Sequence, residues 1–366
     1  MLFFCAHRPA SFPGRNKHFL STLRRLSRMG SLLLLLIVAP AGHVAMHGIR
    51  YSSVGQPVET HATRLTMPSF VLMGGDANVD EAFRWMISKA GGGNFLVIGV
   101  DNSDEYNEYI YRMGGVSSVQ TLIIPDAAAA RNPKVAARIR EADALFIMGG
   151  DQSEYLRYWQ GTPVQEAIQD LARRNVPIGG ISAGLAILGQ YVFSAARGSI
   201  GSAMALADPY HERLTLTRDF LDLPHFEGII MDTHFDTRNR LGRLIAFMAR
   251  ITKDTEQRPV RGIGVDSGAA LLIEGDTAMR VGKAASAVYL LSAHNPPDVC
   301  EPGQPLTYRD ITVHRLTGDE RFDMRTWTKN ETRKGIYLAS VADGKLLKSA
   351  FAPAPGELFH WEYGTY

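Results

Sequence analysis

Continuous apolar runs alternate with amphipathic segments through the middle of the chain. Runs that are apolar on both faces predict buried strands, and they cover residues 69–73, 94–100, 119–124, 144–148 and 176–181. Apolar residues at helical spacing predict helices between these runs, over 82–87, 132–141 and 162–174. Because strands of this kind belong to sheets covered by helices, the pattern predicts an α/β fold with a mainly parallel sheet and helices on both faces.

The later part of the sequence changes character. Two more buried strands are predicted at 229–231 and 262–265, followed by a hairpin over 270–281 that turns at Gly275-Asp276. Further β runs follow at 288–291 and 311–316. We therefore predict an α/β domain over residues 67–282 and a C-terminal β-rich extension of the same domain over 283–366.

The N-terminal residues have a different pattern. Basic residues from Arg8 to Arg28 occur without any acidic residue, and the apolar run 32–38 and an Ala-Pro-Ala site at 39–41 follow. These are the parts of a secretory signal peptide, so we expect residues 1–41 to direct export to the periplasm or the extracellular space. An uncleaved membrane anchor is the alternative. Residues 42–66 are polar and are predicted to be a linker.

Composition narrows the possible functions. The 366 residues carry a net charge of +2, with much of the positive excess near the N-terminus, which argues against a nucleic-acid-binding protein. Cys5 lies in the leader, so Cys300 is the only cysteine of the expected mature chain and no intramolecular disulfide is expected.

No metal site or cofactor is indicated by the sequence. Asp76–Asp80 resembles the start of a calcium loop but lacks its later ligands, so Asn78 or Asp80 is interpreted as a helix N-cap.

The pattern Gly180-Ile181-Ser182-Ala183-Gly184 stands between a predicted strand and a predicted helix. In this context G-x-S-x-G is typical of a sharp turn that presents a nucleophilic serine. The N–H groups of Gly150 and Ala183 are candidates for an oxyanion hole. The alternative is a glycine-rich turn in which Ser182 only caps a helix.

A nucleophilic serine needs a base and an orienting acid. His234 directly follows the strand 229–231 and is the candidate base, with His225 second. Asp266, at the end of the strand 262–265, is the candidate acid, and Asp232 is the alternative.

Arg238, Arg240 and Arg243 follow the candidate base and suit substrate carboxylates, although surface salt bridges explain any single one equally well.

Together these motifs resemble the cyanophycinase family of serine peptidases, which is related to peptidase E. The resemblance covers roughly residues 69–282 and is most specific in the segment from His234 to Leu244. It implies a flavodoxin-like fold similar to class I glutamine amidotransferases and hydrolysis of cyanophycin, a poly-aspartate with arginine on each side chain. It also implies a substrate pocket, lined by Gln152, Asp232, Thr233, Arg238, Arg240 and Arg243.

Two positions depart from the family pattern. Thr233 stands where cyanophycinases have Gln, and Ser267 stands where the family has the Glu of its triad. The main expectation is an exported peptidase that cleaves an Asp- and Arg-rich polymer or Asp-containing peptides through an acyl-enzyme on Ser182. Thr233 leaves open a peptidase of isoaspartyl or other Asp-containing dipeptides, and Ser267 leaves open a weakened or inactive binding homologue. If the triad is weakened in this way, Ser267→Glu is expected to raise kcat. The oligomeric state is not fixed by the sequence, and a homodimer is left open.

Overall fold

Five neighbouring parallel strands form the centre of the first of two sheets. The computed structural model describes residues 48–58, 67–101, 104–329 and 335–348. The parallel strands, in the spatial order β4-β3-β5-β6-β2, are β2 (Ser69–Met73), β3 (Asn94–Gly99), β4 (Ser118–Ile123), β5 (Ala144–Ile147) and β6 (Ile178–Ile181). Nearly every side chain in them is buried, as the apolar runs predict.

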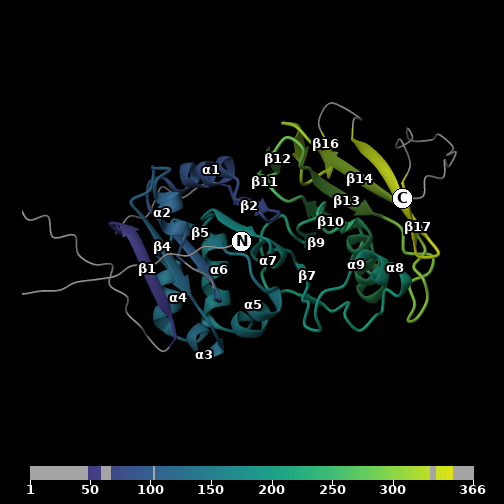
Figure 1. The fold of residues 1–366 in the computed structure, drawn as a ribbon, viewed down its shortest axis with the longest axis horizontal. Coiled ribbons are helices and arrows are strands. Elements are labelled where there is room, and N and C mark those ends of the chain that lie inside the picture. The colour runs from purple at the N-terminus through teal and green to yellow at the C-terminus, as the bar shows by residue number, and fades with distance from the viewer. Residues whose placement is uncertain (1–47, 59–66, 102–103, 330–334, 349–366) are drawn as a thin grey trace, which may run out of the picture. The chain divides into compact units, whose positions relative to one another are not determined.

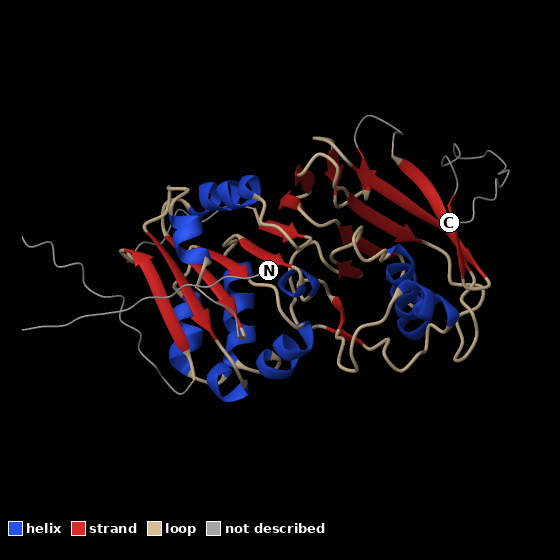
Figure 2. Ribbon diagram, in the orientation of Figure 1, coloured by secondary structure: helices blue, strands red, loops and turns tan. Residues whose placement is uncertain are grey.

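Helices cover both faces of these strands (Figures 1 and 2). On one face are α1 (Asp80–Ala90) and α2 (Tyr106–Tyr111), and Phe83 of α1 packs with Val71 and Phe146. The helices of the other face pack on Leu72 and Leu145, and they are α3 (Ala127–Ala130), α4 (Pro133–Arg140), α5 (Gln152–Trp159) and α6 (Pro163–Arg173). The α/β class predicted from the sequence is confirmed.

Antiparallel strands extend the first sheet at both edges. β1 (Arg50–Gly55) pairs with β4 over its full length. The other edge continues through four strands, β11 (Ala269–Glu274), β12 (Thr277–Gly282), β15 (Arg321–Asp323) and β16 (Thr328–Lys329). The hairpin predicted over 270–281 is β11–β12.

The second sheet has the order β18-β17-β14-β13-β10-β9-β7-β8. Its strands are β7 (Tyr191–Phe193), β8 (Leu216–Arg218), β9 (Ile229–Asp232), β10 (Val260–Val265), β13 (Val288–Ala293), β14 (Tyr308–Leu316), β17 (Ile336–Ala342) and β18 (Lys345–Lys348). The helices α8 (Ser202–Ala207) and α9 (Leu241–Thr255) pack on it through Leu206, Leu244 and Phe247. In the second sheet, as far as the structure describes it, only β7–β9 and β9–β10 pair in parallel, so both sheets are mixed. The strands of the C-terminal part are divided between the two sheets, with β15 and β16 in the first and β13, β14, β17 and β18 in the second.

The structure corrects part of the expected linker. Residues 50–55 form β1, because an edge strand obtains its order from a neighbour's backbone, which periodicity does not reveal. Ile49 is also buried in the core. The predicted signal peptide and the rest of the predicted linker lie outside the described residues, apart from 48–49 and 56–58. Within the described residues, no helix has the length and apolar character needed to span a membrane.

The connection from β6 to α7 (Ala183–Ala186) is a sharp turn at Ser182. Ser182 has φ 54° and ψ −118°, a conformation that costs free energy in a non-glycine residue. A Cβ on Gly180 would lie 2.4 Å from the Gly184 carbonyl, and one on Gly184 would lie 2.2 Å from the Ile147 carbonyl oxygen. Only glycines fit at both positions, which explains the G-x-S-x-G pattern.

We therefore expect Gly180→Ala to destabilise the protein by about 2 kcal/mol or more, since backbone atoms rather than a flexible side chain must move. Thermal denaturation of the purified variant is the measurement. Gly201→Ala is the matched control, because its Cβ would meet nothing within 4 Å. Equal melting temperatures for the two variants would contradict this account of the turn.

Candidate active site

Three turns, each following a strand, bring Ser182, His234 and Asp76 together. Ser182 follows β6 and Asp76 follows β2, the adjacent parallel strand, whereas His234 follows β9 of the second sheet. Backbone hydrogen bonds fix their spacing, since the Ser182 N–H donates to the Met73 carbonyl (3.1 Å) and the His234 N–H to the Gly74 carbonyl (2.9 Å). The carboxyl ends of the strands therefore converge on one site.

Ser182 and His234, the predicted nucleophile and base, lie at hydrogen-bond distance from each other. Ser182 Oγ lies 2.7 Å from His234 Nε2. The imidazole is 5% exposed and therefore has a fixed position. With Nε2 as the acceptor, the Ser182 hydroxyl donates its proton along the line required for general-base catalysis.

The carboxylate beside the base belongs to Asp76. Its Oδ1 lies 3.0 Å from His234 Nδ1. The ring N–H is not aligned on this oxygen, so Nδ1 has no well-directed acceptor; such misalignment is common in enzymes without substrate. Gly75 allows the close approach, because a Cβ there would lie 2.3 Å from the imidazole Cε1.

Asp266, the acid expected from the sequence, does not contact His234. Its Oδ2 accepts from the Ala287 N–H at 2.7 Å, and its side chain is buried at 2% exposure. Burial raises the pKa of this carboxyl to about 6. Successive strand residues point to opposite faces, and the turn after β10 does not bring Asp266 back toward the imidazole. Here the structure corrects the prediction. Asp232, the alternative acid, is bound by Arg240 and Arg243 instead.

Burial dominates the electrostatics of the base. Desolvation lowers the pKa of His234 below its usual value of 6.5, and the positive charges of Arg238 and Arg240 act in the same direction. The contact with Asp76 raises the pKa but does not cancel the desolvation. The ring is consequently neutral, and able to accept a proton, at neutral pH.

Asp232, Arg240 and Arg243 form a buried ion-pair network. Arg243 binds Asp232 in a bidentate manner, with Nε–Oδ2 at 2.7 Å and Nη2–Oδ1 at 2.6 Å, and Arg240 Nη1 lies 3.2 Å from Oδ1. Arg240 also donates to the carbonyl and the hydroxyl of Thr233. All four side chains are less than 10% exposed. The network fixes the turn that carries His234, and none of the four lines the cavity beside Ser182.

Arg238 and Gln152, the other residues predicted to bind substrate, lie outside this buried network. Arg238 is exposed and close enough to lower the pKa values of both His234 and Asp76. Gln152 opens α5 and donates to the Phe193 carbonyl at 3.4 Å. Of the predicted substrate-binding residues, Arg238 therefore keeps an exposed charge near the base. His225, the second candidate base, lies 3.4 Å from Asp276.

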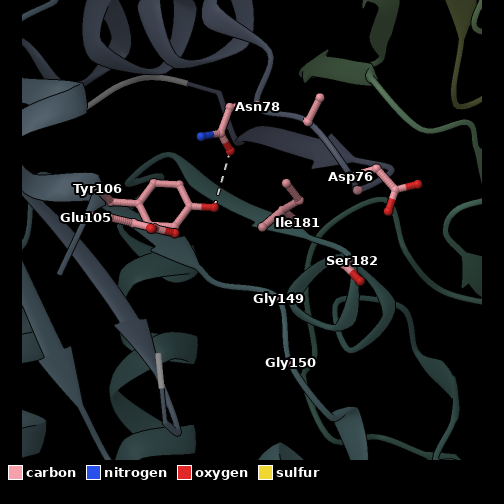
Figure 3. Close-up of a pocket in the computed structure, with 10 residues that line it drawn as sticks. Asp76, Asn78, Glu105, Tyr106, Gly149, Gly150, Ile181 and Ser182 are labelled. Carbon is pink, nitrogen blue, oxygen red and sulfur yellow. Dashed lines mark hydrogen bonds between the residues drawn. The ribbon is translucent and has the colours of Figure 1, made fainter. Parts of the chain in front are cut away.

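A cavity of about 430 Å³ opens beside the nucleophile (Figure 3). Its lining includes Ser182, Asp76 and Glu105. Figure 3 shows Asp76 and Ser182 on one side of Ile181, with the Asn78–Tyr106 hydrogen bond on the other side. Asn78 accepts that bond at 3.2 Å and does not cap α1, whose N-cap residue is Val79.

The predicted oxyanion donors flank the serine. Gly150 lines the cavity with Ser182, and Ala183 is the first residue of α7. Gly150 has φ 154°, which favours glycine, and the Tyr155 hydroxyl anchors its turn by donating to the carbonyls of Met148 (2.8 Å) and Gly149 (3.0 Å). The positions suit stabilisation of a developing oxyanion.

Sequence reasoning missed Asp76. Its signal was present, because Gly74-Gly75-Asp76 follows a buried strand as the other site residues do. The sequence of residues 76–80 predicts a helix N-cap at Asn78 or Asp80 instead, because the calcium-loop pattern that it begins is incomplete. Among the described residues, no group of His, Cys, Asp and Glu has an arrangement suited to a metal ion.

Comparison with known proteins identifies a family and several relatives of this chain. The family described as Peptidase family S51 matches residues 98–281. A cyanophycinase of Trichormus variabilis is 29% identical over 225 residues, which are 59% of this chain and 68% of that protein. A cyanophycinase of Synechococcus elongatus is 28% identical, over 59% of this chain and 64% of that protein. The crystal structure of a peptidase from an acI-B1 Actinobacterium is 18% identical, with a TM-score of 0.47, covering 70% of this chain and 97% of that one.

The lowered pKa of His234 sets the expected pH dependence. The neutral ring is the form that accepts a proton, so the rate of Ser182 labelling by a fluorophosphonate should fall at low pH with a midpoint below 6.5, as the ring takes up a proton. The measurement is the second-order labelling rate between pH 4.5 and 8.5. A midpoint above 6.5 would show that burial does not control this group.

Removing Asp232 would leave two buried guanidinium groups without their counter-charge. We expect Asp232→Asn to lose roughly 3–5 kcal/mol of unfolding free energy, measured by guanidinium denaturation. The control is Glu212→Gln, which breaks an exposed pair with Arg197 and should change stability by less than about 0.5 kcal/mol. Similar losses in both variants would refute a structural role for the network.

Proposed function

Because the chain belongs to peptidase family S51, we propose that it hydrolyses peptide bonds through an acyl-enzyme on Ser182. The observation that carries this proposal is the 2.7 Å contact between Ser182 Oγ and His234 Nε2 at the strained turn after β6. A serine that only caps a helix would not need a buried imidazole at hydrogen-bond distance.

The reaction follows from this geometry. Ser182 Oγ attacks the carbonyl carbon while His234 Nε2 takes its proton, and the N–H groups of Gly150 and Ala183 stabilise the negative oxygen. His234 then gives the proton to the leaving amine, which departs and leaves an ester on Ser182. A water molecule, deprotonated by the same imidazole, hydrolyses the ester and restores the hydroxyl.

The charges near the nucleophile favour a substrate with both signs of charge. Asp76 and Glu105 give the cavity an acidic lining that suits a guanidinium group, and the exposed Arg238 suits a carboxylate. An Asp- and Arg-rich polymer carries both groups. The names of the cyanophycinase relatives agree with this class of substrate, so we propose a cyanophycin-like polymer as the substrate.

The two alternative functions each depended on one residue that departs from the family pattern. A peptidase of isoaspartyl dipeptides depended on Thr233, whose side chain is buried against Arg240 and does not line the cavity. An inactive binding homologue depended on the loss of the family Glu at Ser267, and Asp76 supplies a carboxylate beside His234 instead. No described contact favours either alternative over a peptidase that cleaves an Asp- and Arg-rich polymer.

We also propose that the protein is exported. The basic stretch, the leucine run and the Ala-Pro-Ala site at 39–41 support it. N-terminal sequencing of the protein from its native host would test the proposal, with a mature end close to Ala41 as the expected result.

We expect wild-type protein to release soluble products from cyanophycin, identified by mass spectrometry, and Ser182→Ala to lower the rate by at least about 10⁴-fold without unfolding. Isoaspartyl dipeptides are assayed in parallel and decide between the two substrate classes. The proposal fails if Ser182→Ala keeps the activity of the wild type on whichever substrate is cleaved.

A further inference from the structure

Ser267, the residue that replaces the family Glu, binds the acid of this site. Its hydroxyl lies 2.5 Å from Asp76 Oδ2, the carboxylate oxygen that does not face His234. The Thr237 hydroxyl lies 3.2 Å from Ser267 Oγ and 3.4 Å from the same Asp76 oxygen. Two hydroxyl groups therefore hold one side of the carboxylate while the imidazole lies on the other.

The backbone of Ser267 is itself held in place. Its N–H donates to Asp236 Oδ1 at 2.9 Å, and its carbonyl accepts from the Ser286 hydroxyl at 2.7 Å. The Gly268 N–H donates to the Gly75 carbonyl at 3.1 Å, which ties this turn directly to the turn carrying Asp76. The hydroxyl of Ser267 thus has a defined position relative to the acid.

Asp76 needs such support. Its side chain is 50% exposed, and its backbone has φ 61°, so neither packing nor a regular element fixes the carboxylate. An exposed carboxylate with free rotation about its side-chain bonds spends part of its time away from the imidazole. A hydroxyl donor on the far oxygen limits that rotation and leaves Oδ1 facing Nδ1.

We propose that Ser267 is a positioning residue, which holds Asp76 against His234 and so moves the orienting acid from the turn after β10 to the turn after β2. This rests on the proposed hydrolase function. The substitution that departs from the family pattern is then part of a working catalytic arrangement. A Glu at position 267 would place a second negative charge beside Asp76, so Ser267→Glu should lower activity, opposite to the expectation from sequence.

The charges around this pair agree with the proposal. The Ser267 hydroxyl is the main cause that lowers the pKa of Asp76, with His234 and Arg238 acting in the same direction. The charged groups facing His234 are Asp76, Arg238 and Arg240, and only Asp76 raises its pKa. Displacement of Asp76 should therefore lower the pKa of His234 further.

The test is a double-mutant cycle on the full chain. Ser267→Ala should lower the fluorophosphonate labelling rate about 10- to 100-fold at pH 7.5, and Ser267→Thr, which keeps the hydroxyl, should stay within about threefold of wild type. In the background of Asp76→Gly, which suits the positive φ, Ser267→Ala should have no further effect. Ser88→Ala is the matched control, since it removes an exposed hydroxyl of α1 that donates to the Trp85 carbonyl rather than to a residue of the site.

A second measurement does not require turnover. In NMR titrations, Ser267→Ala should lower the pKa of His234, whereas Ser88→Ala should leave it unchanged. Additive effects of Ser267→Ala and Asp76→Gly, or an unchanged His234 pKa in Ser267→Ala, would overturn the proposal. Wild-type protein that is neither labelled nor able to cleave any substrate would instead refute the hydrolase function, and the titration would still decide the role of Ser267.

Discussion

The turn after β2 is the constraint on which the site depends. Its backbone carbonyls at Met73, Gly74 and Gly75 accept hydrogen bonds from Ser182, His234 and Gly268 in turn. Two of these three donors belong to turns that follow strands of the second sheet, β9 and β10. One short segment of backbone therefore sets the distance between Ser182, which follows a strand of one sheet, and His234, which follows a strand of the other.

Glycines make this junction possible. A Cβ on Gly74 would lie 2.0 Å from the Asp266 carbonyl oxygen, and one on Gly75 would enter the imidazole of His234. The elbow glycines 180 and 184 satisfy the same kind of requirement on the serine side. Strain at Ser182 and at His234, which has φ 45°, persists because the surrounding hydrogen bonds over-determine both turns.

The arginines after His234 illustrate how burial changes the meaning of a motif. Their spacing suggested a carboxylate-binding surface, yet Arg240 and Arg243 use their donors on Asp232 and on neighbouring oxygens. A bidentate, fully desolvated pair is stable only when each partner stays charged and hydrogen-bonded. In this protein the pair holds the base in place, and Arg238 alone of the three is exposed.

The sequence by itself determined the α/β class, the strand–turn–helix at Ser182 and the approach of His234 to that turn, because each depends on a local pattern that apolar periodicity and glycine spacing reveal. Tertiary structure alone decided three other features. It placed β9 and β10 in a second sheet, ordered β1 against β4, and set Asp76 rather than Asp266 beside His234. Those outcomes depend on which distant backbone a segment pairs with and on which way one side chain points. Asp76, for example, contacts His234 and Ser267, although both are far from it in the sequence.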